Sequence, residues 1–147
     1  MRIVYFGIPD LGLICLKTLL ERKINIIAVV PPVAEHPAHK VIVNIAKENN
    51  ITSLFFKNSP NEPVFVNSFK QLKPDLAIVC AFDHLISEEL LNIPPLGFIN
   101  CHPSLLPEYR GGNPYFHVIA NGEKETGVTI HYMDKTFDTG DIITQWE

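Results

Sequence analysis

The sequence is poor in cysteine and contains no long apolar run. Its 147 residues include three cysteines, Cys15, Cys80 and Cys101, which are widely spaced and odd in number. A disulfide-stabilised secreted domain would show a different pattern, so a reducing, cytoplasmic environment is expected. A membrane-spanning helix needs about 18 or more consecutive apolar residues, and the sequence has no such stretch. Met1 leads almost directly into a strand-like run, with no signal peptide ahead of it.

Basic clusters and metal-binding patterns are also missing. The formal net charge is -4, and no block of Lys and Arg stands out, so broad electrostatic binding of nucleic acid is not expected. The turn Gly7-Ile8-Pro9-Asp10 is not the G-x-G-x-x-G loop of a dinucleotide site. His36 and His39 are spaced as two metal ligands could be, but no third ligand is near, so no metal site is expected.

What the sequence does contain is a regular alternation of strand-like and helix-like segments. Short apolar runs rich in β-branched residues predict strands. They lie at 2–6, 24–30, 52–56, 75–80, 97–100, 128–133 and 142–146. Helices are predicted between them, one opened by Pro9 and Asp10 and the others at 41–47, 66–72, 86–91 and 114–120. This alternation predicts a doubly wound α/β sheet with helices on both faces, and the continuous run 75–80 is expected at its centre.

In such sheets, ligands bind outside the carboxyl ends of the strands. Asn100 and His102 follow the strand at 97–100, and in extended chain they project to one side while Cys101 projects to the other. This alternation favours a packed thiol over a Cys-His nucleophile, although both interpretations fit the residues. The adjacent glycines Gly111 and Gly112 suggest a loop whose backbone approaches a ligand closely.

Each of these features also has an ordinary structural explanation. The segment from Asp138 to Asp141 suits a turn for conformational reasons alone. His84, His117 and His131 are isolated and are expected to serve packing or surface roles. The residues by themselves therefore predict a soluble α/β domain with a polar site near Asn100 and His102.

Four blocks of sequence, taken together and in order, carry a more specific resemblance. They are Asn100-x-His-Pro-Ser-Leu-Leu-Pro107, Tyr109-Arg-Gly111, Glu125-Thr-Gly-Val-Thr129 and Asp138-Thr-Gly-Asp141. In this arrangement the sequence resembles the 10-formyltetrahydrofolate-dependent formyltransferases, above all the branch that acts on methionyl-tRNA, and it is also similar to the sugar N-formyltransferases. The resemblance covers residues 1–147 and implies one catalytic domain with a Rossmann-like fold.

The resemblance implies roles for particular residues. Asn100, His102 and Asp138 correspond to the catalytic set, in which the amide and imidazole donate to a developing oxyanion and the carboxylate orients the charged imidazole. The folate pocket would be formed by Phe82, Asp83, His84, Leu85 and Ile86, with Phe137 closing it. The amine side would be lined by Ser104, Leu105, Leu106, Pro107, Arg110 and Gly111. The implied partners are a folate donor and an amine acceptor, without a metal.

Three departures from the family pattern limit what the resemblance implies. The turn after the first strand lacks the glycine-rich phosphate loop of glycinamide ribonucleotide enzymes, which disfavours that acceptor. The segment 33–40 is shorter than the basic insertion of tRNA-acting members. The chain also stops at Glu147, so we expect an incomplete catalytic unit whose uncovered sheet face favours homo-oligomers. A formyltetrahydrofolate hydrolase and a non-catalytic folate-binding remnant remain alternatives.

Overall fold

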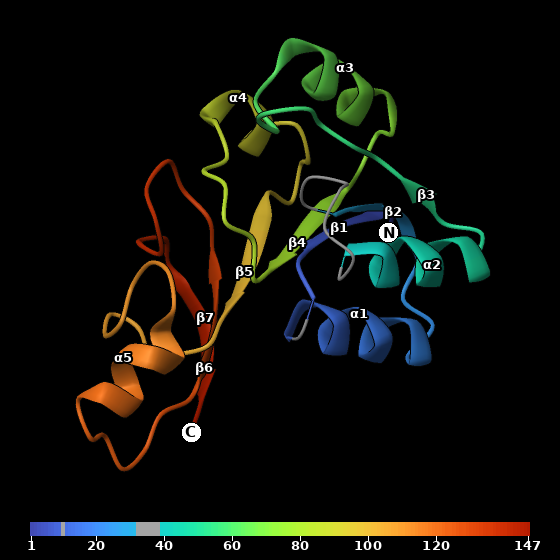
Figure 1. Ribbon diagram of the computed structural model, residues 1–147. Helices are drawn as coiled ribbons and strands as arrows, with labels where there is room; N and C mark the ends of the chain where they lie inside the picture. Colours follow the sequence, from blue (N-terminus) through green and yellow to red (C-terminus); the bar gives the residue numbers. More distant parts are fainter. Residues whose placement is uncertain (10, 32–38) are drawn as a thin grey trace.

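The computed structural model describes residues 1–9, 11–31 and 39–147, and it shows the predicted α/β sheet (Figure 1). Seven strands lie in the order β3-β2-β1-β4-β5-β6-β7. The strands are β1 (Ile3–Gly7), β2 (Ile26–Val30), β3 (Thr52–Ser53), β4 (Leu76–Cys80), β5 (Phe98–His102), β6 (Val128–Tyr132) and β7 (Ile142–Trp146). The first five are parallel, and β6 and β7 are antiparallel to their neighbours. As predicted, β4 is the middle strand.

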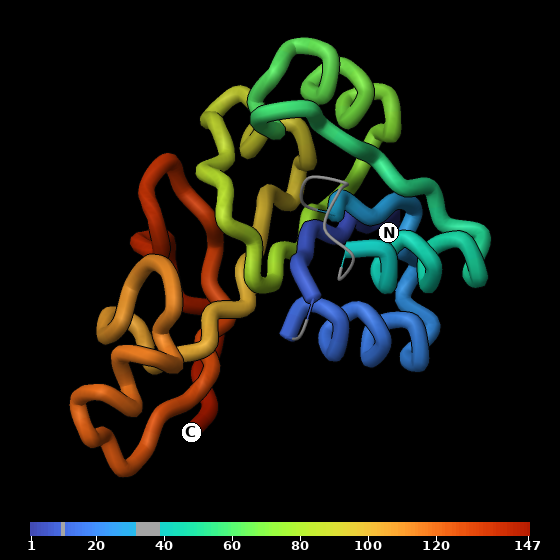
Figure 2. Tube along the Cα trace, in the orientation of Figure 1, coloured from blue at the N-terminus to red at the C-terminus, as the bar shows by residue number. Residues whose placement is uncertain are grey.

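The described helices are α1 (Leu11–Glu21), α2 (His39–Glu48), α3 (Pro63–Gln71), α4 (Glu88–Leu91) and α5 (Pro114–Ala120). Helices α1 to α4 cover the two faces of the parallel part of the sheet, and α5 lies beside β6 and β7 (Figure 1). Val4 and Phe6 project toward α3 and α4, whereas Ile3 and Tyr5 project toward α1 and α2. This alternation along β1 divides the buried side chains into two cores, one on each face. The tube view shows α1 and α2 together on one side of the sheet and α3 and α4 on the other (Figure 2).

Most element boundaries shift from the sequence prediction by one to three residues, and three of these differences have a clear structural cause or affect the site. The strand expected at 52–56 is reduced to β3, because Phe56 leaves the edge and is buried against the aromatic side chains of α3. The helix expected from Ile86 begins instead at Glu88, where the Ser87 hydroxyl accepts a hydrogen bond from the Leu90 N–H and caps the helix. Strand β5 continues to His102, so Asn100 and His102 lie within it. The expected helix start at Asp10 falls outside the described residues.

The turn that joins β6 to β7 begins beside the amino end of β5 and reaches along this strand as far as Asn100. The Met133 N–H donates to the Phe98 carbonyl at 2.9 Å, and the Tyr132 N–H donates to the Asp141 carbonyl at 2.9 Å. Gly140 packs so closely against the Tyr132 carbonyl that a Cβ would have no room there. These contacts fix the two ends of the turn from Met133 to Asp141, and Asp138 within it reaches Asn100 and the Gly111 N–H. No helix in the described parts of the chain is both long and apolar enough to cross a membrane.

Candidate functional site

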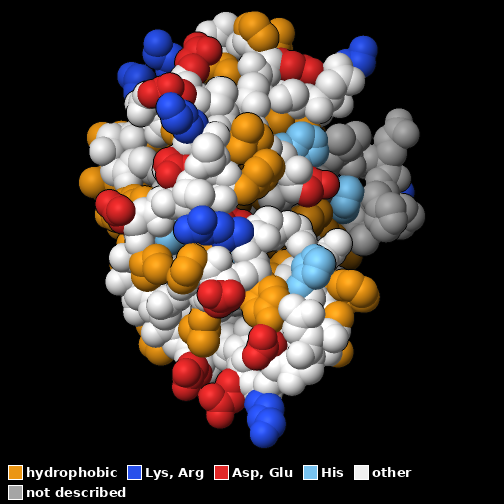
Figure 3. Space-filling view, turned by 90° about the vertical axis from the view of Figure 1, so that its left-hand side faces the viewer, with side chains coloured by type: hydrophobic (Ala, Val, Ile, Leu, Met, Phe, Trp, Pro, Cys, Tyr) orange, Lys and Arg blue, Asp and Glu red, His pale blue; other side chains and the backbone are white. Residues whose placement is uncertain are grey.

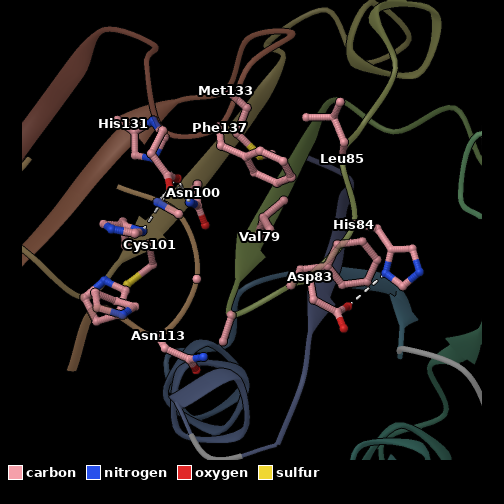
Figure 4. A pocket seen from close by; sticks show the side chains of 18 of the residues that line it. Val79, Asp83, His84, Leu85, Asn100, Cys101, Asn113, His131, Met133 and Phe137 are labelled. Carbon is pink, nitrogen blue, oxygen red and sulfur yellow. Dashed lines mark hydrogen bonds and ion pairs between the residues drawn. The ribbon is translucent and has the colours of Figure 1, made fainter. Parts of the chain in front are cut away.

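A cavity of about 420 Å³ opens at the carboxyl ends of β1, β4 and β5. Four segments supply most of its walls: the loop after β4, strand β5 with the loop that follows it, strand β6, and the turn before β7, while Ile8 just after β1 and Val79 from β4 add to them. Figure 4 shows Met133 and Phe137 together on one side, Asp83 and His84 on another, and Asn100 and His131 at the far end. The cavity thus combines an apolar part with a polar end.

Strand β5 supplies the two polar groups that the sequence analysis placed together. Asn100 and His102 are two residues apart on an extended strand, so both face the cavity. His102 is buried, with 4% of its surface exposed. Its Nε2 lies 2.9 Å from the Tyr109 carbonyl oxygen and its Nδ1 lies 3.5 Å from Asp138 Oδ2. Both ring nitrogens therefore face acceptors, as expected for a protonated imidazole.

The Asp138 carboxylate contacts several polar groups of the site. Its Oδ2 accepts a hydrogen bond from the Gly111 N–H at 2.8 Å, and its Oδ1 accepts one from Asn100 Nδ2 at 3.1 Å. Burial acts to raise the pKa of Asp138, but the contact with His131, the Gly111 N–H and the charge of His102 outweigh it and hold the pKa below its ordinary value. The residue has a φ of 54°, a left-handed conformation that Asp tolerates better than most residues. Asp138 is therefore ionised and firmly held.

His131 is a fourth polar member of the site, and the sequence analysis assigned it only a packing or surface role. It is 1% exposed, and its Nε2 lies 3.2 Å from Asn100 Nδ2 and 3.4 Å from Asp138 Oδ1. The antiparallel register of β5 and β6 sets Asn100 directly opposite His131. Once the residues at 128–133 were assigned to a strand, their alternation would have put Thr129 and His131 on one face. The pairing register, which the sequence does not reveal, was needed to identify the partner.

The loop after β4 provides most of the apolar wall. Phe82, Asp83, His84 and Leu85 line the cavity, as does Phe137 from the opposite turn. Phe82 also packs against Phe6 in the core, with ring centroids 5.4 Å apart. Asn61 clamps the loop, because its side chain donates to the Leu85 carbonyl at 2.7 Å and accepts from the Ser87 N–H at 2.7 Å.

Ile86 departs from the set expected for the folate pocket. It is 1% exposed and belongs to the core beneath α3 and α4, so it does not line the cavity. The chain alternates at this point, and the apolar side chain that follows Leu85 turns inward. Ile86 is therefore a packing residue that anchors the loop.

Most of the loop expected to line the amine side does not reach the cavity. Of the six residues assigned to it, only Gly111 reaches the cavity, beside Pro103, Gly112 and Asn113. The Ser104 hydroxyl donates a hydrogen bond to the Glu108 carbonyl at 2.7 Å, and the Leu106 N–H donates one to Thr129 Oγ1 at 3.1 Å. Hydrogen bonds between the backbone of Ser104 and Leu106 and the Thr129 hydroxyl therefore tie this loop to β6, and Arg110 is exposed outside the cavity.

Cys101 lies between the two polar residues of β5 but packs on the other face of the sheet. It contacts the core beneath α1 and α2 and pairs in register with Cys80 on β4. A hydrogen bond from the Cys80 thiol lowers the pKa of Cys101. All three cysteines are free thiols. Because Cys101 faces away from Asn100 and His102, the structure favours the packed thiol over the Cys-His nucleophile.

Two further expectations concern the charge of the surface and the absence of a metal site. On the face shown in Figure 3, acidic and basic side chains are interspersed, and the described residues form no continuous basic area there. Among residues 1–9, 11–31 and 39–147, no group of three or more His, Cys, Asp or Glu side chains is placed to hold a metal ion. His36 and most of the segment 33–40 lie outside the described residues.

The fold and site together define a class of protein. A doubly wound sheet whose carboxyl edge holds an amide, two imidazoles and one carboxylate beside an apolar cavity is typical of α/β proteins that bind a small ligand at the strand ends. Residues 1–147 match the formyl transferase family. The chain belongs to this family.

Similar proteins support the same assignment. The chain is 40% identical to methionyl-tRNA formyltransferase from Clostridioides difficile over 153 aligned positions, covering 100% of the chain and 49% of the relative. It is 33% identical to the bifunctional polymyxin resistance protein ArnA of Wigglesworthia glossinidia brevipalpis, covering 99% of the chain and 23% of that protein. The chain spans about half the length of the curated methionyl-tRNA formyltransferases it matches.

Solved structures show the same fold. Phosphoribosylglycinamide formyltransferase from Bacillus halodurans superposes with a TM-score of 0.84 at 25% identity, over 99% of this chain and 78% of that one. Glycinamide ribonucleotide transformylase 1 from Geobacillus kaustophilus gives a TM-score of 0.79 at 27% identity, over 99% of this chain and 80% of that one.

Proposed function

We propose that this protein transfers a formyl group from 10-formyltetrahydrofolate to a primary amine. The observation that carries the proposal is the cluster of Asn100, His102 and Asp138 at the polar end of the cavity, in a chain of the formyl transferase family. The transfer forms a bond between the amine nitrogen and the formyl carbon and breaks the bond from that carbon to N10. One proton leaves the amine, and one is gained by N10.

The apolar part of the cavity suits the folate donor. A pterin is flat and aromatic, and Phe82, Leu85 and Phe137 offer it apolar surface. The backbone of the loop from Asp83 to Leu85 is available for the polar edge of the ring, and the Asn61 clamp keeps this loop in place. The formyl group would then lie toward Asn100, because the polar end of the cavity begins there.

The chemical step requires donors for the oxygen that becomes negative as the amine attacks. In our proposal Asn100 donates an amide N–H to this oxygen, and His102 supplies a proton from Nδ1. The His102 Nδ1 contact with Asp138 is 3.5 Å, longer than the usual charge-assisted hydrogen bond of about 2.7–2.9 Å. This proton is therefore the one that a substrate or a bridging water can share. Asp138 stabilises the protonated ring and holds Asn100 at the same time.

The acceptor amine is expected near the segment from Gly111 to Pro114. This segment lines the cavity, and its adjacent glycines leave the backbone open to a ligand. The relatives include proteins named for methionyl-tRNA, for phosphoribosylglycinamide and for polymyxin resistance. We therefore propose a primary amine as the acceptor class and leave its identity to the assay.

The proposal is tested by measuring tetrahydrofolate release from 10-formyltetrahydrofolate with and without candidate amines. The panel contains methionyl-tRNA, an amino-sugar nucleotide and glycinamide ribonucleotide. Release that requires an amine, with formylated amine as the product, is the expected result. Release without any amine would instead identify a hydrolase, and folate binding without release would identify a non-catalytic remnant.

A further inference from the structure

Three thiols meet behind the site, on the face of the sheet that carries α1 and α2. Cys80 and Cys101 pair in register on the neighbouring parallel strands β4 and β5. Both side chains point toward α1, and Cys15 of α1 reaches the same part of the core. The Cys80 thiol contacts Cys101 on one side and Cys15 on the other. These residues therefore form one thiol cluster, which no step of the proposed reaction uses.

The members of the thiol cluster differ in exposure and in acidity. Cys80 is 0% exposed, whereas Cys15 and Cys101 are partly exposed. The hydrogen bond from Cys80 lowers the pKa of Cys101, although burial acts to raise it. Contact with Cys80 also lowers the pKa of Cys15, to about 7. Both partly exposed thiols are therefore readily ionised, and the thiolate is the form that a peroxide oxidises.

Backbone spacing suits Cys80 and Cys101 to a disulfide. Neighbouring strands lie about 4.8 Å apart, and a disulfide needs a Cα separation of about 4.4–6.8 Å. The Cβ atoms of a disulfide come as close as about 3.5–4.5 Å, so the bond would draw the two strands together by roughly 0.5 Å. Such a bond is strained and easily reduced again. Cys15 lies on a helix, where no strand ladder sets its distance from Cys80.

The same two strands carry the polar end of the cavity. Cys101 lies between Asn100 and His102 along β5, so a shift of its backbone moves both of these side chains. Cys80 is followed by Ala81, which lines the cavity in a left-handed conformation with a φ of 51° and begins the loop after β4. A bond between the strands would thus displace two walls of the cavity. Catalytic groups must be held to within about 0.5 Å, and a misplacement of about 1 Å can lower a rate about 100-fold.

We propose that Cys80 and Cys101 form an oxidation site, at which a hydroperoxide joins the two thiols in a reversible disulfide that slows formyl transfer. First, the Cys101 thiolate attacks one peroxide oxygen. A sulfur–oxygen bond forms and the oxygen–oxygen bond breaks, which gives a sulfenic acid, and the departing oxygen takes up the proton that Cys101 released. Next, Cys80 attacks this sulfur. The sulfur–sulfur bond forms, and the oxygen leaves with the Cys80 proton as water. Two thiols are oxidised and one peroxide is reduced, and an added dithiol reverses the change by exchange.

Oxidation of Cys101 also prepares Cys80 for the second step. Contact with Cys101 is the largest of the effects that raise the pKa of Cys80, and contact with Cys15 and burial add to it. The sulfenic acid no longer carries the thiolate charge, so the repulsion from Cys101 falls away. Cys80 then loses its proton more easily and becomes the attacking thiolate.

Peptide mapping tests the oxidation site without any turnover. Wild-type protein, Cys101→Ala and Cys15→Ala are treated with hydrogen peroxide, blocked with iodoacetamide, digested without reductant and analysed by mass spectrometry. Cys15→Ala is the matched control, because it removes the third thiol of the cluster and keeps the pair. We expect a linked Cys80–Cys101 peptide in wild type and Cys15→Ala, absent from Cys101→Ala and lost on treatment with dithiothreitol. Wild-type protein without this peptide, whatever the oxidation state of Cys101, or with a Cys15–Cys80 link in its place, would overturn the proposal.

Turnover shows whether the disulfide acts on the site. After the peroxide is removed, oxidised wild-type protein should release tetrahydrofolate about 10-fold more slowly than reduced protein, and dithiothreitol should restore the rate. Cys15→Ala should respond in the same way, whereas Cys101→Ala should keep its rate after peroxide treatment. Linked wild-type protein that turns over as fast as reduced protein would refute the effect on formyl transfer. This arm rests on the proposed function: reduced protein that formylates no amine would refute that function, while the linked peptide still tests the oxidation site.

Discussion

The most informative single substitution is Asp138→Asn, because it keeps the size of the side chain and removes its charge. In the wild-type site, the carboxylate accepts from the Gly111 N–H at 2.8 Å and from Asn100 Nδ2 at 3.1 Å, and it faces His102 Nδ1 at 3.5 Å. An amide at this position has one acceptor oxygen. If that oxygen stays on the Gly111 side, its nitrogen confronts the Asn100 nitrogen and the two donors repel each other.

The free energy lost in Asp138→Asn can be expressed as a fall in the turnover rate. A hydrogen bond to a charged group contributes about 1.5–3 kcal/mol, and about 1.4 kcal/mol corresponds to a tenfold change in rate. Because Asp138→Asn weakens both the Asn100 and the His102 contacts, we expect turnover to fall about 10²–10³-fold, which is also typical of losing an oxyanion donor. The variant should bind folate normally, since Asp138 lies at the polar end of the cavity.

The rate of the variant provides the refutation. If Asp138→Asn turns over at more than about a tenth of the wild-type rate, Asp138 does not act through His102 and Asn100.

Three further predictions follow from the same contacts. Cys101→Ala should retain nearly full turnover, because the thiol packs against Cys80 on the far face; loss of activity in this variant, with Asn100→Ala active, would restore the thiol nucleophile. Asn61→Ala releases the loop after β4, so the KM for the folate donor should rise several-fold with little change in kcat, and steady-state kinetics that show the reverse would contradict the clamp. The native pKa of Asp138 is depressed, so its contribution to stability is present above its unfolded pKa of about 3.9 and is lost as pH falls through the native pKa. Thermal melts should therefore show Asp138→Asn less stable than wild type at pH 7, and the difference should shrink on acidification.

The sequence predicted the arrangement of the fold because each strand carries a local signal. The continuous apolar run at 75–80 indicated a strand buried on both faces, and it is β4 at the centre of the sheet. The two-residue spacing of Asn100 and His102 placed both on one side of an extended chain, where the structure brings Asp138 to meet them. The resemblance to the formyltransferases supplied the link from β5 to Asp138, which no local pattern could provide.

Other parts of the site depend on tertiary contacts that cannot be predicted from a short stretch of sequence. His131 meets Asn100 only because β6 pairs with β5 in one particular antiparallel register. Ile86 turns into the core while its neighbour Leu85 faces the cavity, although the two residues are similar in polarity. The Ser104 hydroxyl donates its hydrogen bond to the Glu108 carbonyl, so it does not point its hydrogen toward a substrate.

The central claim is that the polar cluster transfers a formyl group to an amine. The most direct measurement supplies 10-formyltetrahydrofolate labelled with carbon-13 in its formyl group and follows the label by NMR, using wild-type protein and the variants Asn100→Ala and His102→Ala. The account predicts that the label appears as a formamide on the amine, at a rate that each variant lowers by about 10²–10³-fold while folate still binds. Label released as formate whether or not an amine is present, or transfer at the wild-type rate in both variants, would contradict it.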